Sequence, residues 1–184
     1  MDEKIRNVRP IWSTLAALVA AGLLALPSAV SSRTPEAEAA VVSGRAKVID
    51  GDTIDIAGTR IRLEGIDAPE SKQMCKRKGR GLWDCGAEAT AYLKRMTGGR
   101  QVACVSAGED RYGRMLGWCK MDGRDINREM VASGYAWAFV RYSKRYVPAE
   151  QEARKSKAGV WQGEAEPAWD FRARRRAKRL GQRS

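Results

Sequence analysis

Two short acidic stretches hold the residues of this sequence that are best suited to chemistry. They are residues 50–53 (Asp-Gly-Asp-Thr) and 67–70 (Asp-Ala-Pro-Glu). Apolar and polar residues alternate between them around a turn at 57–59, which predicts a β-hairpin. Because a hairpin brings its two ends together, Asp52 and Asp67 are expected to share one site. Paired carboxylates favour a hard cation such as Ca²⁺. The alternative is a hairpin whose acidic turns are solvated and inert.

Two arginines extend this chemistry to phosphate. Arg62 lies within the predicted hairpin, and Arg114 ends a distant Asp-Arg-Tyr-Gly-Arg motif at 110–114. Cleavage of a phosphodiester passes through a five-coordinate phosphorus with added negative charge, which two guanidinium groups and a cation can stabilise. The Glu70 carboxylate can accept a proton from the attacking water, or orient that water. These residue types therefore indicate phosphodiester hydrolysis.

The overall charge points to a polyanionic partner. The chain of 184 residues has 34 basic and 22 acidic residues, a formal net charge of +12. The first 39 residues are balanced in charge, so the excess lies in the remainder. Such a body favours nucleic acid or an anionic membrane surface. The sequence contains no histidine, which excludes histidine-ligated zinc, a Ser-His-Asp triad and histidine acid–base catalysis.

The N-terminus has the pattern of an export signal. Basic residues precede an apolar run at 15–26, and an Ala-x-Ala sequence stands at 37–39. This pattern predicts a signal peptide over 1–39, with cleavage nearer Ala29 as the alternative, and a secreted or periplasmic protein. The alternative is an uncleaved membrane anchor, since residues 10–32 carry no charge. In either case, membrane contact is expected only through this leader.

The four cysteines form an even set, as expected in an oxidising compartment. Four cysteines can form two disulfides in three ways. The preferred way joins Cys75 to Cys85 and Cys104 to Cys119. A zinc site is the alternative, but no close Cys-x-x-Cys pair supports it. The loop between the first two cysteines is rich in Lys, Arg and Gly. The basic residues of this loop and of the segment between Glu70 and Cys75 are expected to add phosphate contacts beside the site; they are Lys72, Lys76, Arg77, Lys78 and Arg80.

The order of predicted elements favours an α+β fold that is mostly a β-barrel. It fits a small closed barrel with added helices better than a doubly wound sheet. Strands are expected at 44–49, 53–56, 60–66, 102–105 and 115–120, and helices at 86–96, from Asp125 or Asn127 to 133, and at 148–158. The apolar stretch 135–140 is expected to be a strand or part of the core wall.

The domain proper is expected to span 40–163, followed by a basic tail at 164–184. The last thirteen residues, 172–184, contain seven basic residues and no acidic ones. Such segments are commonly solvated, and they often bind nucleic acid or anionic surfaces. We expect a partly helical or disordered tail that acts as a non-specific affinity arm, with a simple solubility tail as the alternative.

Three separated motifs resemble the staphylococcal nuclease (thermonuclease) family. They are Ile-Asp-Gly-Asp-Thr at 49–53, Arg-Leu-x-Gly-Ile-Asp-Ala-Pro-Glu at 62–70, and the motif at 110–114; Asp122, Gly123 and Asn127 also fit. The resemblance covers roughly residues 42–163. It implies a five-stranded OB-fold barrel with about three helices. It also implies Ca²⁺-dependent hydrolysis of DNA and RNA by water, leaving 3′-phosphate ends.

The resemblance assigns roles to individual residues. It implies that Asp52 and Asp67 bind the metal, either Ca²⁺ or Mg²⁺, with Asp50 as a further acid nearby. Ala68 replaces a family threonine that contributes its main-chain carbonyl, which alanine keeps. The implied catalytic residues are Arg62, Arg114 and Glu70.

The implied nucleotide contacts are less complete. Tyr112, Tyr142 and Arg111 are expected to bind substrate. Val140 stands where the family has a tyrosine that flanks the base. The nucleotide pocket is therefore where this chain departs most from the family pattern.

Together these observations predict an exported, metal-dependent nuclease with little sequence specificity. A monomer without a protein partner is expected. The first alternative is a non-catalytic OB-fold module that binds nucleic acid, and the second is an envelope protein whose basic tail holds anionic lipid. A full set of two arginines, Glu70 and two metal-site aspartates favours the enzyme.

Overall fold

A computed structural model of the protein describes residues 39–182. Residues 1–38, which hold nearly all of the predicted signal peptide, lie outside the described part of the chain. Among residues 39–182, no helix is both long enough and apolar enough to cross a membrane.

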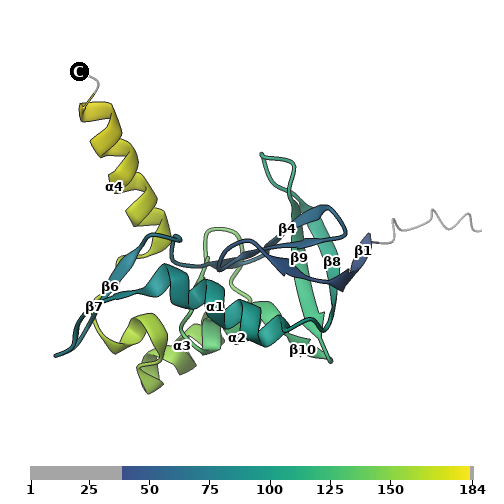
Figure 1. Ribbon diagram of the computed structural model, residues 1–184, viewed down its shortest axis with the longest axis horizontal. Coiled ribbons are helices and arrows are strands. Elements are labelled where there is room, and N and C mark those ends of the chain that lie inside the picture. Colours follow the sequence, from purple (N-terminus) through teal and green to yellow (C-terminus); the bar gives the residue numbers. More distant parts are fainter. Residues whose placement is uncertain (1–38, 183–184) are drawn as a thin grey trace, which may run out of the picture. The chain divides into compact units, whose positions relative to one another are not determined.

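The main sheet curls into the predicted OB-fold-like barrel. Its strands are β1 (Val41–Arg45), β2 (Lys47–Val48), β3 (Thr53–Ile56), β4 (Thr59–Leu63), β8 (Gln101–Glu109) and β9 (Met115–Met121). They are hydrogen-bonded in the order β1-β8-β9-β4-β3-β2, and only β4 and β9 run parallel. Figure 1 shows β1, β8, β9 and β4 side by side. Because β1 and β2 belong to one bent segment, the order returns to its start, and five chain segments enclose the core.

The predicted hairpin is β3–β4. Ile54 and Ile61 face each other across it, and both are fully buried, as are Ile56 and Leu63. Burying each such side chain contributes about 1.5–3 kcal/mol. The alternation of apolar and polar residues therefore fixes which face of the hairpin points into the barrel core.

Helices cover the barrel and continue beyond the predicted domain. They are α1 (Cys85–Thr97), α2 (Ile126–Ala132), α3 (Val147–Ser156) and α4 (Ala168–Gly181), with a 3₁₀ turn at Gly159–Gln162. Asp84 caps α1 by accepting a hydrogen bond from the Ala87 amide, and Asp125 caps α2 in the same way. Of the two predicted caps of the second helix, Asp125 is thus the one used. Asn127 is buried instead, and it bonds the backbone of Cys119, Glu64 and Gly117.

Several short strands differ from the predictions. The Lys/Arg/Gly-rich loop is a hairpin of β6 (Met74–Arg77) and β7 (Gly81–Asp84). The apolar stretch 135–140 contains only a two-residue strand, β11 (Trp137–Ala138), which pairs with β5 (Ile66–Asp67). A further short strand, β10 (Arg124–Asp125), pairs with β9. Composition alone concealed the first hairpin because its strands are only four residues long and the segment is rich in Lys, Arg and Gly.

A second cluster of buried residues, here called the second core, lies outside the barrel. It joins the β6–β7 hairpin to the C-terminal segment, and its members are Cys75, Trp83, Cys85, Trp137, Val160 and Ala168. The Lys76 amide donates to the Glu164 carbonyl at 2.9 Å. A Cβ on Gly163 would lie 2.1 Å from the Lys76 carbonyl oxygen, so only glycine allows this approach. The hairpin and the segment that leads into α4 are therefore packed backbone against backbone.

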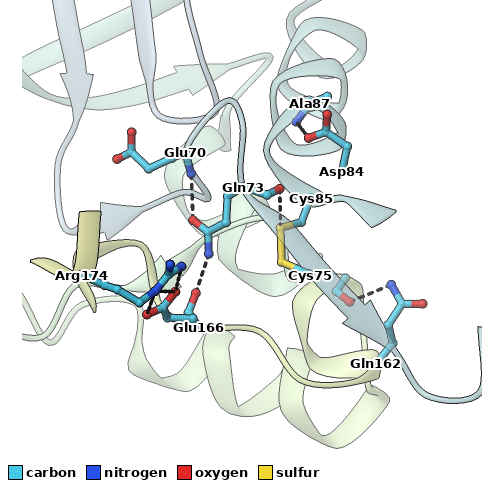
Figure 2. The surroundings of a disulfide bond; sticks show 10 residues. Glu70, Gln73, Cys75, Asp84, Cys85, Ala87, Gln162, Glu166 and Arg174 are labelled. Atoms are coloured by element: carbon cyan, nitrogen blue, oxygen red, sulfur yellow. Dashed lines mark hydrogen bonds and ion pairs between the residues drawn. A yellow bond between two sulfur atoms is a disulfide. The ribbon is translucent and has the colours of Figure 1, made fainter. Parts of the chain in front are cut away.

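Two disulfides, Cys75–Cys85 and Cys104–Cys119, give the preferred pairing. The first closes the β6–β7 hairpin at its base, beside Gln73, whose side chain links the Glu70 amide to the Glu166 carbonyl (Figure 2). The second joins facing residues of β8 and β9. Both are compatible with an extracellular or periplasmic location.

Candidate active site

A single cleft collects the predicted site residues. It has a volume of 730 Å³, and every predicted site residue except Asp67 lines it; these are Asp50, Asp52, Arg62, Ala68, Glu70, Arg111, Tyr112, Arg114 and Tyr142. Asp67 is fully buried beneath the guanidinium groups that contact it. Val140 does not line the cleft, and neither do the basic residues of the β6–β7 hairpin. The expectation that these basic residues add phosphate contacts beside the site stays a prediction, and the hairpin itself packs against the C-terminal segment.

The β3–β4 hairpin brings the two aspartates together, and Arg62 joins them. Its Nη1 lies 2.7 Å from Asp52 Oδ1, and its Nη2 lies 2.7 Å from Asp67 Oδ1. The other Asp52 oxygen accepts a hydrogen bond from the Ala68 amide at 3.0 Å. The fork of one guanidinium therefore sets the spacing of both carboxylates.

The site concentrates negative charge in a poorly solvated place. Burial raises the pKa of the Asp67 carboxyl, and hydrogen bonds from Arg172 oppose only part of that effect. Burial and the neighbouring Asp52 charge likewise raise the pKa of Asp50. Burial alone would lower the pKa of Arg62, but the charges of Asp52 and Asp67 raise it overall. The site thus stabilises the positive charge of Arg62. The neighbouring arginines offset only part of the cost of burying the Asp67 carboxylate.

Arg114 reaches the cleft from a tight loop that holds its side chain. Asp110 accepts hydrogen bonds from the Arg114 amide at 3.0 Å and from its Nε at 2.8 Å, and also from the Tyr112 amide at 2.9 Å. Arg111 lies over the Tyr112 ring, 4.8 Å from its centroid, and Arg114 lies 5.5 Å from it. The motif at 110–114 is therefore a self-contained unit that presents two arginines and one aromatic ring.

A further arginine, Arg172 of α4, enters the site. Its Nη2 lies 2.8 Å from Asp67 Oδ2, and its Nη1 lies 3.1 Å from Asp67 Oδ1 and 2.8 Å from Glu70 Oε1. Burial would lower the pKa of Arg172, but the hydrogen bonds that it donates to the Asp67 and Glu70 carboxylates raise it overall. The sequence pattern placed Arg172 only among the basic residues of the tail, and it did not predict this contact. The one signal for it is the pair of aromatic residues, Trp169 and Phe171, at the start of an otherwise basic segment.

The donor set around Arg62 suits a hard divalent cation. In the described part of the chain, no three Asp, Glu or Cys side chains form a ready-made metal cage. The available oxygens are the carboxylates of Asp52 and Asp67 and the Ala68 carbonyl. Ca²⁺ and Mg²⁺ accept such oxygens and complete their shells with water or substrate phosphate. The oxygens present therefore fit such an ion in their chemistry.

Comparisons with known proteins agree with this geometry. The family model described as "Staphylococcal nuclease homologue" matches residues 60–163. The chain belongs to this family.

Individual relatives of the family carry varied names. The chain is 41% identical over 130 residues to a protein named "Succinoglycan biosynthesis protein ExoI" from Rhizobium meliloti (strain 1021), covering 69% of this chain and 68% of the relative. It is 37% identical over 137 residues to an "Uncharacterized endonuclease" of Escherichia coli O157:H7, covering 70% and 83%. It is 37% identical over 120 residues to "Staphylococcal-like nuclease CAN1" of Arabidopsis thaliana, covering 64% and 34%. The family and these endonuclease names support a nuclease.

Some residues of the site lie within the family match at 60–163, and others lie outside it. Arg62, Asp67, Glu70 and Arg114 fall inside residues 60–163, whereas Arg172 follows them. Helix α4 is held against the family domain by aromatic contacts. The Trp169 ring stacks on Phe139 at 5.4 Å with an interplanar angle of 5°, and both line the cleft. The Trp169 ring therefore packs against the family domain and also forms part of the cleft wall.

Proposed function

We propose that this protein is an exported, metal-dependent nuclease that hydrolyses DNA and RNA with little sequence specificity and leaves 3′-phosphate ends. The observation that carries the proposal is the bridging of Asp52 and Asp67 by Arg62, in one cleft with Arg114 and Glu70. The substrate assignment also rests on family membership and on the basic body of the chain.

The chain's own residues divide the work of hydrolysis. Arg62 and Arg114 supply guanidinium groups to the phosphoryl oxygens, where negative charge grows in the transition state. Glu70 holds the attacking water and accepts its proton at a carboxylate oxygen. One Glu70 oxygen bonds Arg172. This contact limits the orientations that the carboxylate can take.

Asp52, Asp67 and the Ala68 carbonyl would hold the cation, Ca²⁺ or Mg²⁺. A bound divalent ion supplies Lewis-acid stabilisation of the phosphoryl oxygens. Arg62 and Arg172 already bond the Asp67 oxygens, so these guanidinium groups share their acceptors with any ion at the site.

The side chains around the cleft favour contacts that do not read sequence. Arg111 and Arg114 suit phosphates, and the exposed rings of Tyr112 and Tyr142 suit stacking on any base. Stacking and phosphate contacts are tolerant of sequence. The Val140 position contributes no ring, so Tyr142 carries more of the base contact.

A plasmid-cutting assay with the purified protein tests the proposal. We expect cutting with Ca²⁺ or Mg²⁺ and none with excess chelator. Glu70→Gln and Arg114→Ala should each lower the rate roughly 10²–10⁴-fold without unfolding the protein, because each removes a group acting in the transition state. Lys155→Gln, an exposed change on α3, serves as the control.

Failure to cut under every condition would refute the enzyme. Retained binding of nucleic acid in that case would establish the non-catalytic module. Unchanged activity of either variant would remove that residue from the catalytic set.

A further inference from the structure

We propose that helix α4 carries a binding site for the phosphodiester backbone of nucleic acid, formed by Arg175, Arg176 and Arg179 beside Phe171. This site would hold the part of the strand that leaves the active site. The proposal rests on the nuclease function proposed above and specifies where the enzyme holds its substrate. It concerns residues that lie beyond the family match at 60–163.

The site is a groove that continues from the cleft. The groove has a volume of 270 Å³ and is lined by Glu70, Phe171, Arg172, Arg175, Arg176 and Arg179. Three of these residues, Glu70, Arg172 and Arg176, also line the active-site cleft. A strand with its scissile phosphate near Glu70 can therefore enter the groove without crossing the wall of the cleft.

Three of the four arginines that line the groove have no acidic partner within residues 39–182. On α4, Arg172 is paired with Asp67 and Glu70, and Arg174 is paired with Glu166. Within residues 39–182, Arg175, Arg176 and Arg179 form no ion pair with a carboxylate, and all three are exposed. Arg175 and Arg179 are four positions apart, as are Arg172 and Arg176, and like charges at this spacing oppose the helix. A polyanion along this face would relieve that repulsion.

The start of α4 is fixed against the domain, so the groove is preformed. Ala168 is fully buried, Trp169 stacks on Phe139, and Arg172 is held by two carboxylates. Figure 1 shows α4 beginning beside β6 and extending away from it. The seven-residue step from Arg172 to Arg179 spans about 10 Å of helix. This length matches about three nucleotide steps along one strand of a duplex.

The composition of α4 favours nucleic acid over an anionic membrane. A helix that lies in a membrane interface presents a broad apolar face opposite its basic one. Beyond Phe171, the only large apolar residue of α4 is Leu180. The groove opens beside Glu70, where a substrate strand is expected and a lipid surface is not.

The test measures binding separately from cutting. Fluorescence anisotropy with a labelled single-stranded oligonucleotide, in chelator, gives the salt dependence of affinity for the full chain. The variant is Arg175→Gln with Arg176→Gln and Arg179→Gln, which keeps good helix formers. The control removes the same charge from exposed positions outside the cleft and the groove, by Lys94→Gln with Lys155→Gln and Lys178→Gln.

We expect the log–log salt slope to become shallower by about 2 in the variant, because three phosphate contacts each contribute about 0.7. The control slope should change much less. With a divalent cation, the rate of the variant should fall further on a long single strand than on a dinucleotide. The dinucleotide is too short to span the groove from Glu70 to Arg179.

Two results would overturn the proposal. One is a variant whose salt slope equals that of the control. The other is a variant that keeps its oligonucleotide slope but loses binding to vesicles containing anionic lipid, which would make α4 a membrane site. If the unmodified protein cuts neither substrate while the slopes still differ, the nuclease proposal fails and the α4 site stands.

Discussion

The barrel core and the second core are built from different materials. The barrel core is filled mainly by aliphatic side chains from alternating strand positions, such as Ile54 and Ile61. The second core combines a disulfide with two tryptophans, Trp83 and Trp137, and joins segments more than 80 residues apart in the sequence. The indole Nε1 atoms of Trp83 and Trp161, which pack in or against it, have no hydrogen-bond partner within the described residues.

Each core positions a different part of the site. The barrel presents Asp52, Arg62 and Asp67, which face a shared cleft through the register of β3 and β4. The second core holds the start of α4 and thereby positions Arg172. The difference teaches that the paired aspartates depend on the fold itself. The contact of Arg172 with Asp67 and Glu70 depends on the attachment of α4, which can be loosened without unfolding the barrel.

The largest expected effect is a change in the barrel core. Ile61→Ala should lower the free energy of unfolding by about 2–5 kcal/mol, because it leaves a cavity at a fully buried position. Denaturant titration measures the loss. Hydrogen exchange should show that both cores lose protection together, since α4 has no support without the barrel. Protection lost only near Ile61 would contradict that dependence.

Removing each disulfide in turn should show that the two cores differ in what stabilises them. Cys75→Ala with Cys85→Ala should cost about 2–4 kcal/mol, and so should Cys104→Ala with Cys119→Ala. The first pair should loosen only the β6–β7 hairpin and α4, whereas the second should destabilise the barrel. Hydrogen exchange resolved by segment distinguishes these results. If both variants lost hydrogen-exchange protection in the same segments, the second core would not unfold independently of the barrel core.

A smaller effect is expected on the cation. Arg172→Gln should tighten Ca²⁺ binding by about tenfold, or about 1.4 kcal/mol, because it frees both Asp67 oxygens from a competing guanidinium. Isothermal titration calorimetry measures the affinity. Arg176→Gln is the matched control, since it removes the same charge from α4 but no contact with Asp67. Equal affinities in the two variants would mean that only net charge matters.

The smallest effect concerns the Arg114 loop. Burial opposes ionisation of Asp110, but hydrogen bonds from Arg114 and Tyr112 lower its pKa below the ordinary value of 3.8. The stabilising contribution of this carboxylate is therefore present above pH 3.8 and lost as the pH falls through the lowered pKa. An NMR titration of the Asp110 carboxyl carbon should give a midpoint below 3.8. Asp110→Asn should remove the corresponding pH dependence of loop order.

The sequence predicted the barrel well because its evidence is local. Alternation around residues 57–59 specified the β3–β4 hairpin, which carries Arg62 and leads directly into Asp67, so that Arg62 bridges Asp52 and Asp67. The motif at 110–114 is likewise held by its own Asp110. Local patterns of this kind can be interpreted without knowledge of the rest of the fold.

The second core was not predicted because its contacts are long-range. Gln73 and the carbonyl of residue 166 lie 93 positions apart, and no periodicity connects them. The same holds for Arg172, which lies 105 positions from Asp67. A basic segment looks alike in sequence whether it is solvated or docked, and only its two aromatic residues hint at docking.

Gly163 and the β6–β7 hairpin are expected to occur together in related proteins. Its backbone is extended, so its conformation would suit any residue, and only the nearby Lys76 carbonyl forbids a side chain. A related chain without the β6–β7 hairpin can therefore carry any residue at this position. A chain that keeps the hairpin must keep the glycine as well, so the two features should be gained and lost together as these proteins diverge.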